Sequence, residues 1–244
     1  MAHEGIQDPK LPILSQQLLL SVAEEIKMPL LKIARLAEYN SLAAAADRHE
    51  ADNVIRATAE SALHLIDNYI LGVRLALEPQ IFDAESVSVS SVLYDSCQQL
   101  DALAKSYGVG LEIDIAGKFG SVTANRKGLQ AALVSLGASL IEALPALESS
   151  QLKLQLATHK TRYGVVAGVY SDTPQVSAQA IRSGRKLQQN TRQPFIGMSH
   201  NSGAGIFVAD TLLRSMNLKL MTSRHHKKFG IGTVLQLNNQ LQLV

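Results

Sequence analysis

The sequence has little of several features that define common protein classes. Its 244 residues include one cysteine, Cys97, and no tryptophan. A single thiol excludes a disulfide framework and any zinc site built from several cysteines. Aromatic residues make up 5% of the chain, too few for a protein that stacks single-stranded nucleic acid on aromatic rings. Its 23 basic and 21 acidic residues nearly balance, so charge does not indicate nucleic-acid binding either.

Long apolar runs are also missing. No stretch reaches the roughly 18 apolar residues of a membrane span. The opening residues, MAHEGIQDPK, lack the basic-then-apolar pattern of a signal peptide. We therefore expect a cytoplasmic protein that does not insert into a membrane. The 46% apolar composition is sufficient for one large domain or two smaller ones.

The first third of the chain has the periodicity of two long helices. Apolar residues recur every three or four positions from Leu14 to Leu77. Pro29 is expected to kink the first helix, and the polar residues 47–50 mark the turn between the two. Such a hairpin cannot bury its apolar faces alone. Two arrangements remain open: a second copy completing a dimeric four-helix bundle, or packing against the C-terminal half of the same chain.

After Pro79 the periodicity changes, and short alternating segments appear between helices. This order predicts an α+β fold in which helices cover one face of a mixed, mostly antiparallel sheet. We divide the chain into a tail (1–13), the helical hairpin (14–80) and an α/β domain (81–244). The expected helices are 91–107, 126–144 and 204–216. The expected strands are 86–90, 109–115, a short one near 122, 151–159, 162–170, 218–223 and 232–238.

The segment VAEEIKMPLL (22–31) resembles the H-box of sensor histidine kinases, and later segments resemble other motifs of that family in the same order. The resemblance implies a dimerisation and phosphotransfer hairpin followed by a Bergerat-type ATPase domain of the GHKL class, an α/β sandwich. The matching segments are the N-box helix (129–141), the G1 box (170–172), a lid aromatic (Phe195), the G2 box (203–206) and a closing strand (230–234).

The H-box departs from the family where its chemistry occurs. Glu24 occupies the position of the family's phospho-accepting histidine, and a carboxylate has no nitrogen with which to form a phosphoramidate. Glu25 matches the adjacent acid, but has no histidine to act on. Met28 stands where phosphatase activity usually needs an amide or hydroxyl one helical turn further on. We therefore expect no catalytic residue in this segment.

The nucleotide site departs from the family as well. Ser139 replaces the N-box Asn that ligates Mg²⁺, and Ser135 replaces the family's earlier Asn. Glu142 stands where a basic phosphate contact is common, and Pro174 and Val176 replace G1 glycines. We expect no cofactor, with ATP and Mg²⁺ as the open alternative. The residues that would still bind a nucleotide are Ser139, Asp172, Gly203, Gly205 and Thr233.

Several of these positions have a second interpretation. Asp172 either binds adenine or caps the turn after a strand. Gly203 and Gly205 either present helix N-terminal amides to an anion or allow close packing. The lid residues Arg182, Arg185, Lys186 and Arg192 either clamp an acidic group or lie in a solvated loop.

The adjacent His225 and His226 do not predict a metal site. Neighbouring residues of a strand point to opposite faces, so we expect an exposed hairpin turn at these positions. His49 and His64 lack the neighbouring residues of an H-box, and we predict no metal site.

Three functions remain open. The first is a catalytically degenerate, homodimeric signalling scaffold that docks a response-regulator receiver domain through Leu30, Leu31, Ala34 and Glu38, with Glu24 imitating phosphohistidine. The second is a divergent ATP-binding kinase with another acceptor. The third is a protein-binding module unrelated to two-component signalling.

Overall fold

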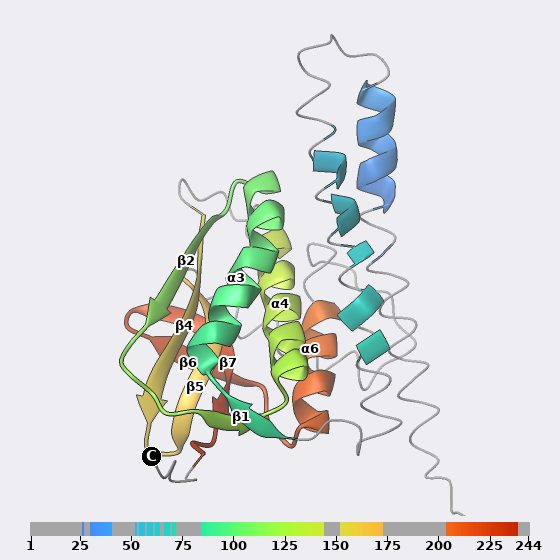
Figure 1. Cartoon of the computed structure of the whole chain (residues 1–244). Helices are drawn as coiled ribbons and strands as arrows, with labels where there is room; N and C mark the ends of the chain where they lie inside the picture. Colours follow the sequence, from blue (N-terminus) through green and yellow to red (C-terminus); the bar gives the residue numbers. More distant parts are fainter. Residues whose placement is uncertain are drawn as a thin grey trace, which may run out of the picture.

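A computed structural model describes residues 30–40, 84–143, 152–172 and 204–238, together with Ile26 and part of the segment 52–71. In this part of the chain, helices cover one face of a five-stranded sheet (Figure 1). The helices are α3 (Val89–Ser106), α4 (Arg126–Ala143) and α6 (Ala204–Ser215). None of them combines the length and apolar character needed to span a bilayer.

The sheet has the spatial order β2-β4-β5-β7-β6. The β2–β4 pair is parallel and the other pairs are antiparallel, so the predicted mixed, mostly antiparallel sheet is confirmed. Its strands are β2 (Gly110–Ile115), β4 (Lys153–Thr161), β5 (Gly164–Ser171), β6 (Met221–His225) and β7 (Lys228–Leu235). A separate antiparallel pair is formed by β1 (Glu85–Val87) and β3 (Val122–Ala124).

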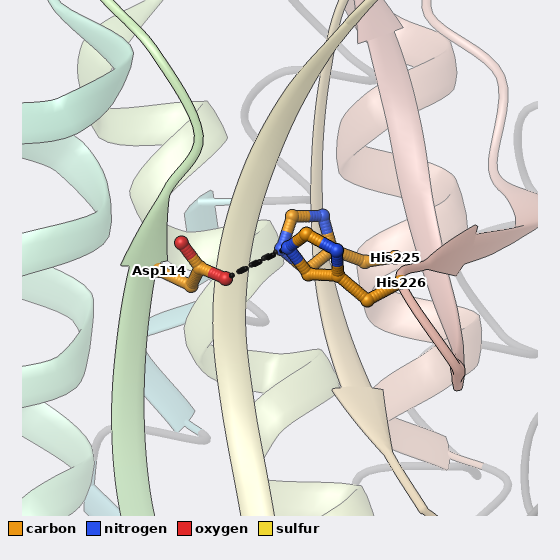
Figure 2. A group of neighbouring side chains, drawn as sticks. All are labelled: Asp114, His225 and His226. Carbon is orange, nitrogen blue, oxygen red and sulfur yellow. Dashed lines mark hydrogen bonds and ion pairs between the residues drawn. The ribbon is translucent and has the colours of Figure 1, made fainter.

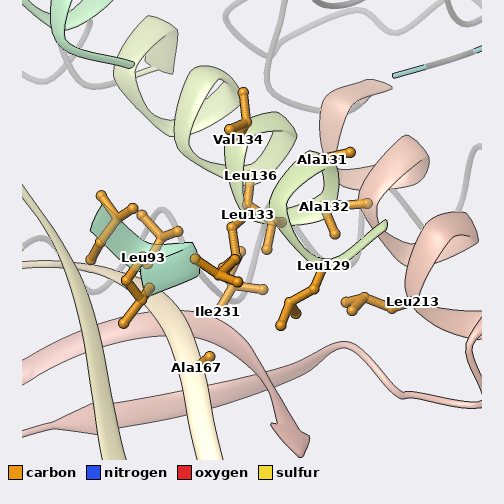
Figure 3. Close-up of a cluster of buried hydrophobic side chains, with 14 of the residues drawn as sticks. Leu93, Leu129, Ala131, Ala132, Leu133, Val134, Leu136, Ala167, Leu213 and Ile231 are labelled. Atoms are coloured by element: carbon orange, nitrogen blue, oxygen red, sulfur yellow. The ribbon is translucent and has the colours of Figure 1, made fainter. Parts of the chain in front are cut away.

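Helix α4 is the centre of the core. It packs between α3 and α6 and over the sheet, so its side chains are buried almost all round (Figure 3). Asn125 begins the helix, because its Oδ1 accepts a hydrogen bond from the Gly128 backbone N–H at 2.8 Å. Alternate strand residues such as Leu156, Val169 and Ile231 complete the core from the sheet side.

Several predicted boundaries differ from the structure, and two of these differences have a clear local cause. The first strand ends at Val87 rather than residue 90, because Ser88 caps α3 by accepting from the Ser91 backbone N–H. The last two strands are displaced along the sequence, because their turn lies at residues 226–227. Register in a hairpin follows its turn, and the turn position was not evident from alternation alone.

The described residues of the N-terminal segment are helical. Residues 30–40 form one helix, and the described residues between 52 and 71 are helical as well (Figure 1). Asn40 Nδ2 donates a hydrogen bond of 2.5 Å to Asp52 Oδ1. Ile26 and Leu71 pack against the core of the α/β part. These contacts show that the helical segments touch their own C-terminal half, which was one of the two open arrangements.

The outer face of the sheet, opposite the helices, has its own buried network. His225, at the end of β6, is only 3% exposed, so the expectation that both histidines are exposed is wrong for His225. Its Nε2 lies 2.8 Å from Asp114 Oδ2 on β2, and its Nδ1 lies 3.3 Å from His159 Nδ1 on β4. Because β2 and β6 are opposite edges of the sheet, the β6–β7 hairpin must curl across the outer face.

This network makes the stability of the protein depend on pH. Burial lowers the pKa of His159 from 6.5, so below pH 6.5 the unfolded chain takes up a proton that the folded chain resists. We expect the free energy of unfolding to fall between about pH 7.5 and about pH 5.5. Urea denaturation at both pH values, on wild type and His159→Gln, measures the effect. An equal pH dependence in the variant would show that other groups cause it.

Candidate functional site

The two N-box positions lie on α4, where other parts of the protein cover them. Ser135 is buried, and its Oγ accepts a hydrogen bond of 3.0 Å from Asn68 Nδ2 in the N-terminal segment. Ser139 is 2% exposed, and its Oγ has no hydrogen-bond partner among the described residues. Both positions therefore face protein in this structure.

Helix α6 lies directly over Ser139. A Cβ atom placed on Gly205 would be 2.2 Å from Ser139 Oγ and 2.8 Å from the Ser135 carbonyl oxygen. Real Cβ atoms do not approach so closely, so the first turn of α6 contacts α4 without room for a methyl group. The structure therefore shows at Gly205 the close packing that was one of its two interpretations. The contact is with a helix rather than with the sheet.

Two of the residues predicted to bind nucleotide, Asp172 and Thr233, lie far apart along the strands of the sheet. Asp172 follows β5 directly and is exposed. Thr233 is buried on β7 opposite Ala167, whereas the end of β5, Ser171, pairs with Phe229. Asp172 therefore lies five residues along the strand direction from the level of Thr233, which is roughly 17 Å. The structure does not bring these two side chains together.

One buried polar residue was missed from the sequence. Thr158 on β4 pairs with Ala167, which in turn pairs with Thr233, so the two threonines flank the same residue of β5. Within the described residues, the buried hydroxyls of Ser139, Thr158 and Thr233 all lack a hydrogen-bond partner. A buried hydroxyl without a partner is costly and normally indicates a water or a ligand. In the sequence, Thr158 is one more polar residue of an alternating strand, and nothing marked it.

The N-terminal segment contacts the α/β part near the end of α4. Lys32 Nζ lies 4.0 Å from the centre of the Tyr107 ring, a cation–π contact. Burial lowers the pKa of Lys32, and the nearby charge of Glu142 opposes that shift. Burial and Glu142 together raise the pKa of Tyr107 to about 12. The charge of Glu142, which we expect to repel phosphate, thus also shifts the pKa values of Lys32 and Tyr107.

The predicted docking residues lie on an exposed helix surface. Leu30 and Leu31 are 56% and 44% exposed, and Ala34 and Glu38 are exposed as well. Leu30 and Leu31 are adjacent in the chain, so they form a small exposed apolar surface on this helix. Other predicted residues lie outside the described part of the chain: Glu24, Glu25, Met28, Gly203, Phe195 and the four basic lid residues.

This arrangement of sheet, helix layer and N-terminal helices is the fold of a histidine-kinase core. The chain is similar to the Acinetobacter baumannii histidine kinase AdeS, with 12% identity and a TM-score of 0.53 over 88% of this chain and 98% of that structure. It is also similar to full-length ShkA, solved in complex with AMPPNP, with 16% identity and a TM-score of 0.51. That match covers 96% of this chain and 47% of ShkA. No protein-family model and no curated protein matches the sequence. At these identities the likeness establishes the fold.

Proposed function

We propose that this chain is a cytoplasmic, catalytically degenerate histidine-kinase-like protein that signals through protein contacts rather than by transferring phosphate. The fold is that of a kinase core, but function depends on the residues at the sites. The observation that carries the proposal is the N-box: both of its positions are serines, one bonded to Asn68 and the other packed under Gly205. Glu24 supports it, because its carboxylate replaces the phospho-accepting nitrogen.

We further propose that two copies associate through the N-terminal helices into a four-helix bundle. Leu63 and Ile70 are 60% and 42% exposed and are seven residues apart, so they lie on one side of the second helical segment. Thr58 and Ala62 on the same segment are buried. Exposed apolar residues at this spacing are typical of a helix that packs against another helix.

A second exposed surface, on the first N-terminal helix, best fits a response-regulator receiver domain. Leu30, Leu31, Ala34 and Glu38 correspond to the region below the H-box where the family docks receivers, and their exposure supports this use. A small apolar surface bordered by Glu38 is compatible with a transient signalling contact.

Nucleotide titration and phosphate transfer test the central claim. We expect titration calorimetry to detect no binding of ATP or ADP at millimolar concentration, with or without Mg²⁺. Neither wild type nor Glu24→His should incorporate labelled phosphate, because restoring the acceptor leaves the nucleotide site unchanged. Incorporation by the Glu24→His variant would show that the ATP site works and would overturn the proposal.

The interaction surfaces are tested by matched charge substitutions. In sedimentation experiments, Leu63→Asp combined with Ile70→Asp should convert a dimer to a monomer. Leu31→Asp should abolish binding to a receiver domain without changing the oligomeric state. Tyr94→Asp is the control, because Tyr94 is 55% exposed on α3 and belongs to neither surface. Equal effects of all these substitutions would contradict the assignment.

The buried hydroxyls favour a second candidate, a divergent enzyme that binds ATP. Two of the three hydroxyls without a described partner, Ser139 and Thr233, are positions that the family uses for nucleotide. This candidate predicts measurable Mg-ATP binding that Ser139→Ala weakens, together with phosphate incorporation at a residue other than Glu24. Titration with ATP and Mg²⁺ separates the two functions.

A further inference from the structure

Three side chains that could ligate a metal meet on the outer face of the sheet. Asp114 comes from β2, His225 ends β6, and His226 belongs to the turn that follows (Figure 2). One carboxylate oxygen and one nitrogen from each histidine lie within 4.8 Å of one another. Asp114 Oδ2 is 2.8 Å from His225 Nε2 and 3.4 Å from His226 Nε2.

The backbone of His226 explains how adjacent histidines reach the same point. Its φ is 52°, in the left-handed region that glycine and asparagine favour. This conformation ends the alternation of the strand, so the two imidazole rings lie 4.4 Å apart instead of on opposite faces.

We propose that Asp114, His225 and His226 form a binding site for a zinc ion. Two imidazole nitrogens and one carboxylate oxygen suit a borderline divalent metal, and zinc sites with three protein ligands take water as the fourth. Bonds of about 2.0–2.1 Å in a tetrahedron place neighbouring ligand atoms about 3.3 Å apart. The two shorter distances in the cluster lie on either side of that value, so small side-chain movements complete the geometry.

The surroundings of the cluster support the donor atoms. His159 lies behind His225, with the two Nδ1 atoms 3.3 Å apart. A metal on His225 Nε2 leaves the proton on Nδ1, which then donates to His159 Nδ1. A hydrogen bond from the second ring nitrogen orients a metal-bound histidine, although the acceptor is more often a carboxylate, a carbonyl oxygen or water. His226 is 71% exposed, so an ion can enter from solvent. The start of β7, next to this turn, is held over β2 independently of the histidines, because Lys228 Nζ lies 3.2 Å from Glu112 Oε2.

A zinc ion at this position would connect the two edges of the sheet. Its ligands belong to β2 and to the end of the β6–β7 hairpin, with β4, β5 and β7 between them in the sheet order. Binding would therefore hold the curled hairpin on the outer face. Because the site needs the folded sheet, zinc should stabilise the folded state over the unfolded chain.

Zinc titration of the full chain tests the proposal. The protein is stripped with a chelator, dialysed, and titrated with zinc chloride by calorimetry, with melting temperature as a second readout. We expect one zinc per chain and a higher melting temperature with zinc. His226→Asn should weaken binding by at least about 100-fold, since loss of a ligand exceeds the usual cost of losing an outer partner. Asparagine tolerates a positive φ, so this variant should fold.

Controls separate this site from other histidines. Asp114→Asn should weaken binding as His226→Asn does, whereas Lys227→Ala, in the same turn but without a metal ligand, should leave it unchanged. Cobalt should bind with the absorption of a tetrahedral ion, and magnesium should not bind. Stoichiometric zinc binding that survives in both ligand variants, or no zinc binding by wild type, would overturn the proposal. Binding that survives in both variants would belong to other histidines of the chain, among them His3, His49, His64 and His200.

Discussion

Replacing Gly205 with alanine is expected to lower the free energy of unfolding by about 2–3 kcal/mol, the upper range for overpacking a core. The new Cβ would lie 2.8 Å from the Ser135 carbonyl oxygen, which belongs to the backbone of α4 and cannot rotate away. It would also lie 2.2 Å from Ser139 Oγ. To accept the methyl group, α6 must move away from α4. Urea denaturation followed by circular dichroism measures the loss.

The close contact has two components that a double variant separates. Ser139→Ala removes Oγ, so Ser139→Ala with Gly205→Ala should recover part of the lost stability. The Ser135 carbonyl contact remains, and recovery should be incomplete. Gly128→Ala is the matched helix control, since its close contact is the flexible end of the Met216 side chain. If Gly205→Ala unfolds at the same urea concentration as wild type, close packing of α6 on α4 does not require a glycine at this position.

Replacing Gly230 with alanine is expected to have a larger effect, about 4 kcal/mol, at the severe end for single substitutions. Its Cβ would lie 2.3 Å from both the Val169 carbonyl oxygen and Tyr170 Cδ1. The carbonyl is part of the neighbouring strand, where β5 and β7 pair. The ring is that of a fully buried tyrosine that covers this glycine on the outer face. Neither atom can move without separating the central strands.

The expected result is a protein with a large fraction of its molecules unfolded, because ordinary domains have only about 5–15 kcal/mol of stability. Removing the ring with Tyr170→Ala should not rescue the variant, because the carbonyl contact persists. Gly110→Ala is the matched strand control, since its nearest neighbours lie 3.7 Å away, an ordinary contact. A cooperative unfolding transition at the wild-type urea concentration in Gly230→Ala would show that the central strands accommodate the methyl group.

The sequence determined the fold class because apolar periodicity records which face of each element is buried. Alternation at 109–115 predicted the strand that the structure has as β2, and the segment 162–170, predicted as one arm of a hairpin, corresponds to β5. The helix predicted at 126–144 corresponds to α4, which ends one residue earlier. The sequence also shows Glu24 directly, and the resemblance to the H-box identifies its position as that of the phospho-accepting histidine.

Contacts between distant segments were decided only by the tertiary structure. Periodicity describes one element at a time, so it could not show that Gly205 packs on Ser139 or that Asn68 bonds to Ser135. Nor could it show that Thr158 is buried with no hydrogen-bond partner among the described residues. The largest difference is His225. Strand alternation placed it in an exposed turn, but the left-handed backbone at His226 and the curl of the β6–β7 hairpin carry it to Asp114 across the sheet. Local pattern fixes which side a residue faces, whereas sheet curvature and turn geometry decide what it meets there.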